Sequence, residues 1–210
     1  MTLRIWGRKT VANVQKVTWC VGELGIAHEY SEDDPSGQAP FDARYLDLKK
    51  GATVPLMDDD GFVLWEGNAI ARYLAEKYGR APFWPTTAAG RAEVGRWMDY
   101  QLSTARVYLH PLIRETLDKE EVARNFRLLA ACMEVVELAL ERRQYLAGDD
   151  FTVGDIPLGI VAYRWFLLDK NRPSMPAIEA WYRRLAKRPA FQRNMFPPED
   201  SFTPVAARQA

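Results

Sequence analysis

The fold of the N-terminal third is indicated most clearly by the stretch Phe62-Val63-Leu64-Trp65-Glu66-Gly67-Asn68-Ala69-Ile70-Ala71-Arg72-Tyr73-Leu74. Its first four residues are apolar, and a second apolar run over residues 53–57 precedes them across the polar residues 58–61. Two short apolar runs joined by an Asp-Gly pair are typical of a β-hairpin. The residues that follow predict a helix over residues 69–78 that ends at Gly79.

The residues before this hairpin predict a strand, a helix and a second strand. Residues 3–6 are expected to form the first strand, and residues 28–30 the second. Between them, apolar residues recur at helical spacing over residues 14–24, and Gly25 is placed to end that helix. The polar stretch 31–40 is expected to be a loop. This order of elements is that of a small α/β unit.

From about Gly90 onward the sequence predicts helices alone. Two long helices are expected over residues 92–117 and 122–146, the second with one continuous apolar face. The stretch Thr152-Val153-Gly154-Asp155 is typical of a helix start. The Thr152 side chain is expected to accept the backbone N–H of Asp155, and the Asp155 side chain to accept that of Thr152. Residues 81–89 form the expected linker. The chain is therefore predicted to have an α/β domain over residues 1–80 and an all-helical domain over residues 88–210.

Composition excludes several classes of function. The chain has 28 Lys and Arg against 28 Asp and Glu, without the basic excess that a nucleic-acid surface needs. No apolar stretch approaches the roughly 20 residues of a membrane span. Two cysteines far apart in a chain of 210 residues indicate a reducing compartment, and they support neither a disulfide framework nor a zinc site. A cytoplasmic protein that binds no nucleic acid, membrane or metal is expected.

Four motifs in the same chain resemble those of the glutathione transferase family, in its bacterial-type cytosolic members. They are the stretch 7–17, the step Val54-Pro55-Leu56, the stretch 64–74 and the stretch 152–156. Their order and spacing cover nearly the whole chain. The resemblance implies a thioredoxin-like N-terminal domain followed by an all-helical bundle, a homodimer, and a role in detoxification in which the thiolate of glutathione attacks a small electrophile.

The resemblance directs attention to the residues Thr10-Val11-Ala12-Asn13. They occupy the position where redox relatives of the thioredoxin-like fold carry Cys-x-x-Cys, so the reactive thiol would be that of glutathione. A free thiol has a pKa of about 8.5, and the site must therefore favour the thiolate through hydrogen bonds and a helix N-terminus. Thr10 and Asn13 are the candidate catalytic donors to the sulfur. The same two residues would also serve as ordinary helix caps.

The resemblance also implies residues that bind the backbone of glutathione. Val54, before a cis proline, would pair its backbone with the cysteinyl part. The Glu66 carboxylate would bind the ammonium of the γ-glutamyl end, and the Gly67 N–H would bind its carboxylate. The family usually has serine where Gly67 stands, so here only the backbone donor is present.

Two further residues are candidates for glutathione binding. Lys50 would bind the glycyl carboxylate, or it is simply a solvated surface charge. Asp99 would reach the glutathione amine of the partner subunit in a homodimer, or it is a solvated or salt-bridged aspartate.

The sequence thus predicts a transferase that uses glutathione as co-substrate and takes a small-molecule electrophile. One alternative is a glutathione-dependent peroxidase or disulfide reductase. Another is a non-catalytic member that uses the fold for binding or regulation.

Overall fold

The computed structural model describes residues 2–32, 54–114, 117–168 and 172–195. Their strands form one mixed sheet in the order β2-β1-β3-β4. Strand β1 (Leu3–Trp6) pairs in parallel with β2 (Glu29–Ser31) and antiparallel with β3 (Leu56–Asp59), which pairs antiparallel with β4 (Phe62–Trp65). The predicted strands are present, although β2 lies one residue later than expected. Most of the predicted loop 31–40, like Lys50, falls outside the described residues.

The predicted hairpin between β3 and β4 turns at Asp60 and Gly61. Both residues have positive φ, 51° and 91°, which is the conformation of the tight hairpin turns that Asp-Gly favours. The turn is shorter than the polar run 58–61 indicated, because Asp58 and Asp59 extend β3. Asp59 is buried and accepts hydrogen bonds from Tyr73, Lys77 and Tyr78 of the following helix, which explains an aspartate inside a strand.

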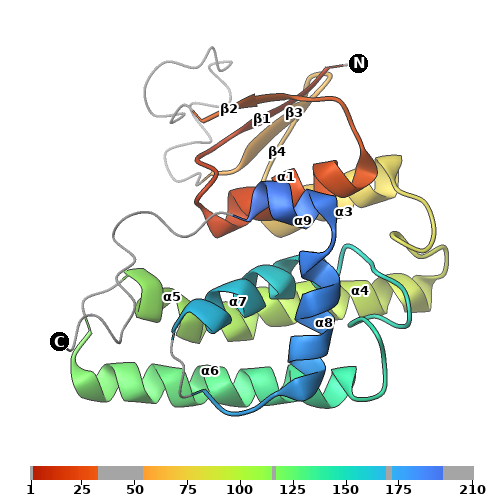
Figure 1. The fold of residues 1–210 in the computed structure, drawn as a ribbon. Helices are drawn as coiled ribbons and strands as arrows, with labels where there is room; N and C mark the ends of the chain where they lie inside the picture. Colours follow the sequence, from red (N-terminus) through yellow and green to blue (C-terminus); the bar gives the residue numbers. More distant parts are fainter. Residues whose placement is uncertain (1, 33–53, 115–116, 169–171, 196–210) are drawn as a thin grey trace.

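Helices α1 (Ala12–Leu24) and α3 (Gly67–Tyr78) lie between the sheet and the remaining helices (Figure 1). Helix α1 ends at Gly25, whose φ of 65° is left-handed, as predicted. Its Val14, Val17 and Val21 are fully buried in the core between the two layers. The two helices start next to each other, since Gly67 of α3 lies against Asn13 of α1.

The rest of the described chain is helical. Helix α4 (Ala88–Tyr100) continues through a π-helical turn, η2 (Gln101–Ala105), into α5 (Arg106–Arg114). The sequence predicts one regular helix over residues 92–117, whereas the structure interrupts it with this π-helical turn. Four further helices follow: α6 (Lys119–Leu140), α7 (Asp155–Leu168), α8 (Pro176–Ala186) and α9 (Pro189–Asn194).

Helix α6 ends at Leu140, six residues before the predicted boundary, and a buried carboxylate further along the chain binds the segment that follows. Oδ1 of Asp155 accepts the backbone N–H of Leu146 at 2.9 Å and the indole N–H of Trp181 at 3.0 Å. Oδ2 accepts the backbone N–H of Thr152 at 2.9 Å, which is one half of the predicted capping pair. The other half is wrong. The turn is tight enough for the Asp155 N–H to bond the Thr152 carbonyl oxygen at 3.1 Å, and the Thr152 hydroxyl accepts from Gly154 instead.

The helical bundle holds α1 from both ends. Near its C-terminal end, Trp19 meets Phe191 of α9 edge-on with ring centroids 5.0 Å apart, and Arg188 forms a two-point ion pair with Glu23 at 2.7 and 2.8 Å. Before its N-terminal end, the Thr10 carbonyl accepts a hydrogen bond from Nη2 of Arg164 in α7 at 3.1 Å. The start of α1 is therefore fixed against the helical bundle. No described helix is long and apolar enough to cross a membrane.

Candidate active site

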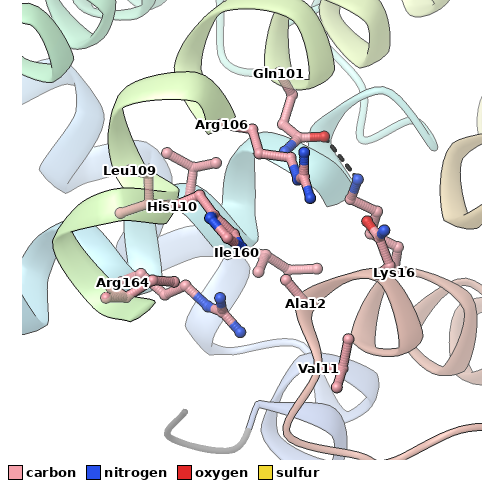
Figure 2. A pocket seen from close by; sticks show the side chains of 12 residues that line it. Val11, Ala12, Lys16, Gln101, Arg106, Leu109, His110, Ile160 and Arg164 are labelled. Atoms are coloured by element: carbon pink, nitrogen blue, oxygen red, sulfur yellow. Dashed lines mark hydrogen bonds between the residues drawn. The ribbon is translucent and has the colours of Figure 1, made fainter. Parts of the chain in front are cut away.

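A cavity of about 90 Å³ lies where the start of α1 faces α5 and α7 (Figure 2). Its wall combines residues of the N-terminal and the helical parts of the chain, so it exists only when the two parts are packed together. The residues that line it are Val11, Ala12, Asn13, Lys16, Gln101, Arg106, Leu109, His110, Ile113, Ile160, Val161 and Arg164.

The first turn of α1 presents backbone N–H groups without a capping side chain. The N-cap residue is Val11, in an extended conformation, and its side chain makes no capping hydrogen bond. Neither Thr10 nor Asn13 therefore stands at the N-cap position. Uncapped N–H groups and the helix dipole make such an end attractive to an anion. Of the two predicted donors, Asn13 lines the cavity, whereas Thr10 is not among the lining residues.

The starts of α1 and α3 touch through their backbones. A Cβ atom at Gly67 would lie 2.7 Å from the Asn13 carbonyl oxygen and 3.2 Å from the Asn13 Cα, closer than ordinary van der Waals contact. Gly67 is buried. The absence of the serine that the family usually carries thus has a steric reason in this chain, since glycine permits the close approach.

Glu66 precedes Gly67 in a strained conformation. Its φ of 73° lies in the left-handed region, which costs a residue other than glycine roughly 1–3 kcal/mol and is concentrated at functional sites. The side chain is exposed, and no described residue forms an ion pair or hydrogen bond with its carboxylate. The carboxylate is therefore available to a ligand.

Val54 lies close to the start of α1. The Val54-Pro55 bond is cis, as predicted. A Cβ atom at Gly7 would stand 3.1 Å from the Val54 Cβ, which places Val54 against the loop that leads into α1. The structure thus brings Val54, Glu66, Gly67 and Asn13 together around the start of α1.

Asp99 lies apart from this group. It is on α4, does not line the cavity, and forms an ion pair with Arg72 of α3 in the same chain. Its side chain is 68% exposed. Within one chain, Asp99 is thus a salt-bridged surface aspartate, which is one of the two alternatives expected from the sequence. A role at the partner's glutathione stays a prediction.

Sequence reasoning missed two cationic side chains of the cavity, Lys16 and Arg164. Lys16 is 1% exposed, and its Nζ donates to the Gln101 side-chain oxygen at 2.7 Å. Its pKa is lowered to about 7, chiefly by burial and also by the charges of Arg106, Arg164 and Arg72, against the opposing effect of Glu66. These residues come from separate helices, so no local pattern connects them. The one sequence signal is a lysine inside a helix whose neighbours are core residues. Among the described residues no group of His, Cys, Asp and Glu could hold a metal ion.

Comparison with known proteins assigns the family. Residues 12–77 match the model of the glutathione S-transferase N-terminal domain, and residues 101–189 match that of the C-terminal domain. Glutathione S-transferase GstB of Escherichia coli strain K12 is 32% identical over 200 residues, which cover 91% of this chain and 96% of the relative. Glutathione S-transferase 3 of Zea mays is 28% identical over 211 residues, 92% of this chain and 93% of the relative.

A solved structure supports the same assignment. The theta class glutathione S-transferase of Xanthomonas axonopodis pv. citri, crystallised with glutathione bound, has 37% sequence identity and a TM-score of 0.80. The alignment covers 91% of this chain and 96% of that one. The fold is that of a glutathione S-transferase, an enzyme that attaches glutathione through its sulfur to a second substrate. The chain belongs to the glutathione transferase family, which confirms the predicted resemblance, fold class and transferase activity.

Proposed function

We propose that glutathione binds across the start of α1 and that its thiolate attacks a small electrophile held in the neighbouring cavity, with Asn13 as the catalytic donor to the sulfur. The observation that carries the proposal is the position of Asn13. It lies in the uncapped first turn of α1 and also on the cavity wall. Thr10 is the weaker candidate, because it does not line the cavity.

The surroundings of Asn13 favour an anionic sulfur. A thiolate beside the first turn of α1 gains from the helix dipole and from the N–H groups of that turn, which have no partner within the helix, and an amide N–H of Asn13 adds a charge-assisted hydrogen bond. Each effect lowers the pKa of the bound thiol and raises the thiolate fraction at neutral pH. The sulfur then forms a bond to the electrophilic carbon, a leaving group departs with its electron pair, and the thiol proton goes to solvent.

The remaining predicted residues hold the rest of the tripeptide. The Val54 backbone pairs with the cysteinyl part, the exposed Glu66 carboxylate binds the γ-glutamyl ammonium, and the Gly67 N–H binds the γ-glutamyl carboxylate. Lys50 serves the glycyl carboxylate. A glutathione-bound relative at 37% identity supports this arrangement.

The proposal includes the assembly and location of the protein. A homodimer would allow Asp99 to act on the partner's glutathione, and the ion pair with Arg72 would then have to open. We assign the protein to the cytoplasm, since both cysteines are free thiols in the interior.

Calorimetry of glutathione binding, with a conjugation assay, tests the role of Asn13. The wild type should bind glutathione with micromolar-to-millimolar affinity. Asn13→Ala should bind within a few-fold of that affinity but lose about 10- to 100-fold in conjugation of an aromatic halide, because one hydrogen bond to a charged sulfur is lost. The pKa of the bound thiol, followed by the ultraviolet absorbance of the thiolate, should rise.

A matched control is Asn125→Ala, which removes a half-buried asparagine of α6 that does not line the cavity and should change neither quantity. An Asn13→Ala variant with an unchanged thiol pKa and rate would remove Asn13 from the mechanism. Absence of glutathione binding by the wild type at millimolar concentration would refute the tripeptide site.

A further inference from the structure

The cavity at the start of α1 is surrounded by positive charge. Lys16 of α1, Arg106 of α5 and Arg164 of α7 contribute to its wall, and none of the described lining residues is acidic (Figure 2). We propose that the electrophile accepted by this cavity carries an acidic group, such as a carboxylate or sulfonate, and that Arg106 and Lys16 bind it. This inference rests on the proposed function and specifies its substrate class.

Arg106 supplies the accessible charge. It is the first residue of α5, it is exposed, and it lines the cavity. In the described part of the chain, no carboxylate or hydrogen-bond acceptor pairs with its guanidinium group. A planar guanidinium with several parallel donors fits a carboxylate or sulfonate better than any neutral group. Arg106 is therefore placed to receive an acidic ligand that enters from solvent.

Lys16 supplies a charge inside the wall. An ammonium group has three N–H donors, and the described residues offer one acceptor, the Gln101 oxygen at 2.7 Å. A buried ammonium without further acceptors or a counter-charge is unfavourable, and its pKa is accordingly lowered to about 7. The groups that act on it are Arg106, Arg164 and Arg72, which disfavour the charged form, and Glu66, which favours it.

An acidic ligand would reverse this balance. Its negative charge beside Lys16 and Arg106 would offset the repulsion among the cations and favour the ammonium form. Binding near neutral pH should therefore be accompanied by proton uptake at Lys16. This coupling gives the proposal a readout that is independent of turnover.

The apolar part of the cavity wall indicates which kind of molecule carries the acidic group. Apolar side chains of α5 and α7 line the same cavity: Leu109, Ile113, Ile160 and Val161. Apolar walls alone discriminate weakly among hydrophobic bodies, whereas an unpaired buried charge discriminates strongly. The expected electrophile is an aromatic or aliphatic body with one acidic substituent.

Glutathione itself is a second possible source of the acidic group, since it has two carboxylates. In the proposed arrangement these carboxylates lie at Gly67 and Lys50, which leaves the cavity cations to the electrophile. The two sources predict different kinetics. Cations that serve glutathione would change its KM with every electrophile, whereas cations that serve the electrophile would act only on acidic ones.

The test compares the carboxylate and the primary amide of one chloronitrobenzoic acid as electrophiles, each rate divided by the uncatalysed rate with glutathione. The wild type should prefer the carboxylate by about tenfold or more in kcat/KM. Arg106→Gln should abolish this preference, and Arg106→Lys should keep part of it. Arg183→Gln removes a 70% exposed arginine of α8 and should leave both rates and the preference unchanged.

A second measurement uses a nitrobenzoate that lacks the halide and so cannot react. Calorimetric titration with saturating glutathione, in two buffers of different ionisation enthalpy, should show proton uptake near pH 7.5 for the wild type and none for Lys16→Met.

The outcomes separate the two proposals. Equal corrected rates with the carboxylate and the amide would overturn the acidic-substrate inference and leave the transferase function standing. A rise in the KM of glutathione by the same factor with both electrophiles in Arg106→Gln would assign the cations to glutathione, and would also overturn it. Failure of the wild type to conjugate either electrophile while it binds no glutathione would refute the proposed function itself.

Discussion

The family resemblance and the structure predict opposite effects of adding a side chain at Gly67, which lies against the backbone of Asn13. Judged from the resemblance, Gly67→Ser restores a hydroxyl that the family usually has, and it should improve glutathione binding. In this structure any side chain at position 67 must displace the backbone of Asn13, since its Cβ would stand 2.7 Å from the carbonyl oxygen. Overpacking of this kind costs about 1–3 kcal/mol.

We therefore expect Gly67→Ala and Gly67→Ser to lower the free energy of unfolding by about 1–3 kcal/mol. The loss corresponds to about 2–4 °C in Tm per kcal/mol for a chain of this size. Because the displaced residue lines the cavity, kcat/KM for conjugation should fall by about 10- to 100-fold. Gly95→Ala is the matched control, since it lies in a helix with no atom within 4 Å of the added Cβ. It should raise stability by up to about 1 kcal/mol through helix propensity.

The assays are urea unfolding followed by far-ultraviolet circular dichroism and steady-state conjugation kinetics. If both Gly67 variants were as stable as Gly95→Ala and kept the wild-type KM for glutathione, the two helix starts could not be in the contact described.

Two further predictions concern buried ionisable groups. Asp155→Ala should destabilise the protein by about 3 kcal/mol or more, because three buried N–H groups lose their acceptor. Asp118→Ala, at the exposed start of α6, should cost only about 0.5–2 kcal/mol in the same urea titration. For Lys16, the unfolded chain has the ordinary pKa of 10.5 and the folded chain a pKa of about 7, so the unfolded state binds the extra proton between these values. Wild-type stability should therefore rise with pH relative to Lys16→Met across this window, by up to about 1.4 kcal/mol per pH unit. A stability difference that stays constant from pH 7 to pH 10 would contradict the lowered pKa of Lys16.

The fold was predictable from local patterns where those patterns decide the structure. The hairpin at Asp60 and Gly61 and the helix end at Gly25 follow from the backbone preferences of a few adjacent residues. The end of α6 was not predictable in the same way. Glu141 rather than a glycine follows Leu140, and the segment beyond is held by the Asp155 carboxylate, which accepts the Leu146 N–H across nine residues.

The candidate site was predictable in part. Its expected glutathione-binding residues are adjacent to recognisable motifs, and the structure gathers Val54, Glu66 and Gly67 at the start of α1. Two cations of the cavity, Lys16 and Arg164, could not be predicted, because they stand 148 positions apart and meet only through the packing of α7 on α1. Long-range packing of this kind leaves no periodic trace in the sequence.

The π turn η2 determines which face of α5 lines the cavity. A π turn holds one residue more than the regular helix around it, and one residue corresponds to about 100° of rotation about the helix axis. Arg106, Leu109, His110 and Ile113 follow the turn at the spacing of one helix face, and that face lines the cavity. Deletion of a single residue within 101–105 would keep every one of these side chains and yet turn the whole face away. In a lineage of such proteins, the chemical character of the pocket could therefore change through one short insertion or deletion, without any substitution among the residues that line it.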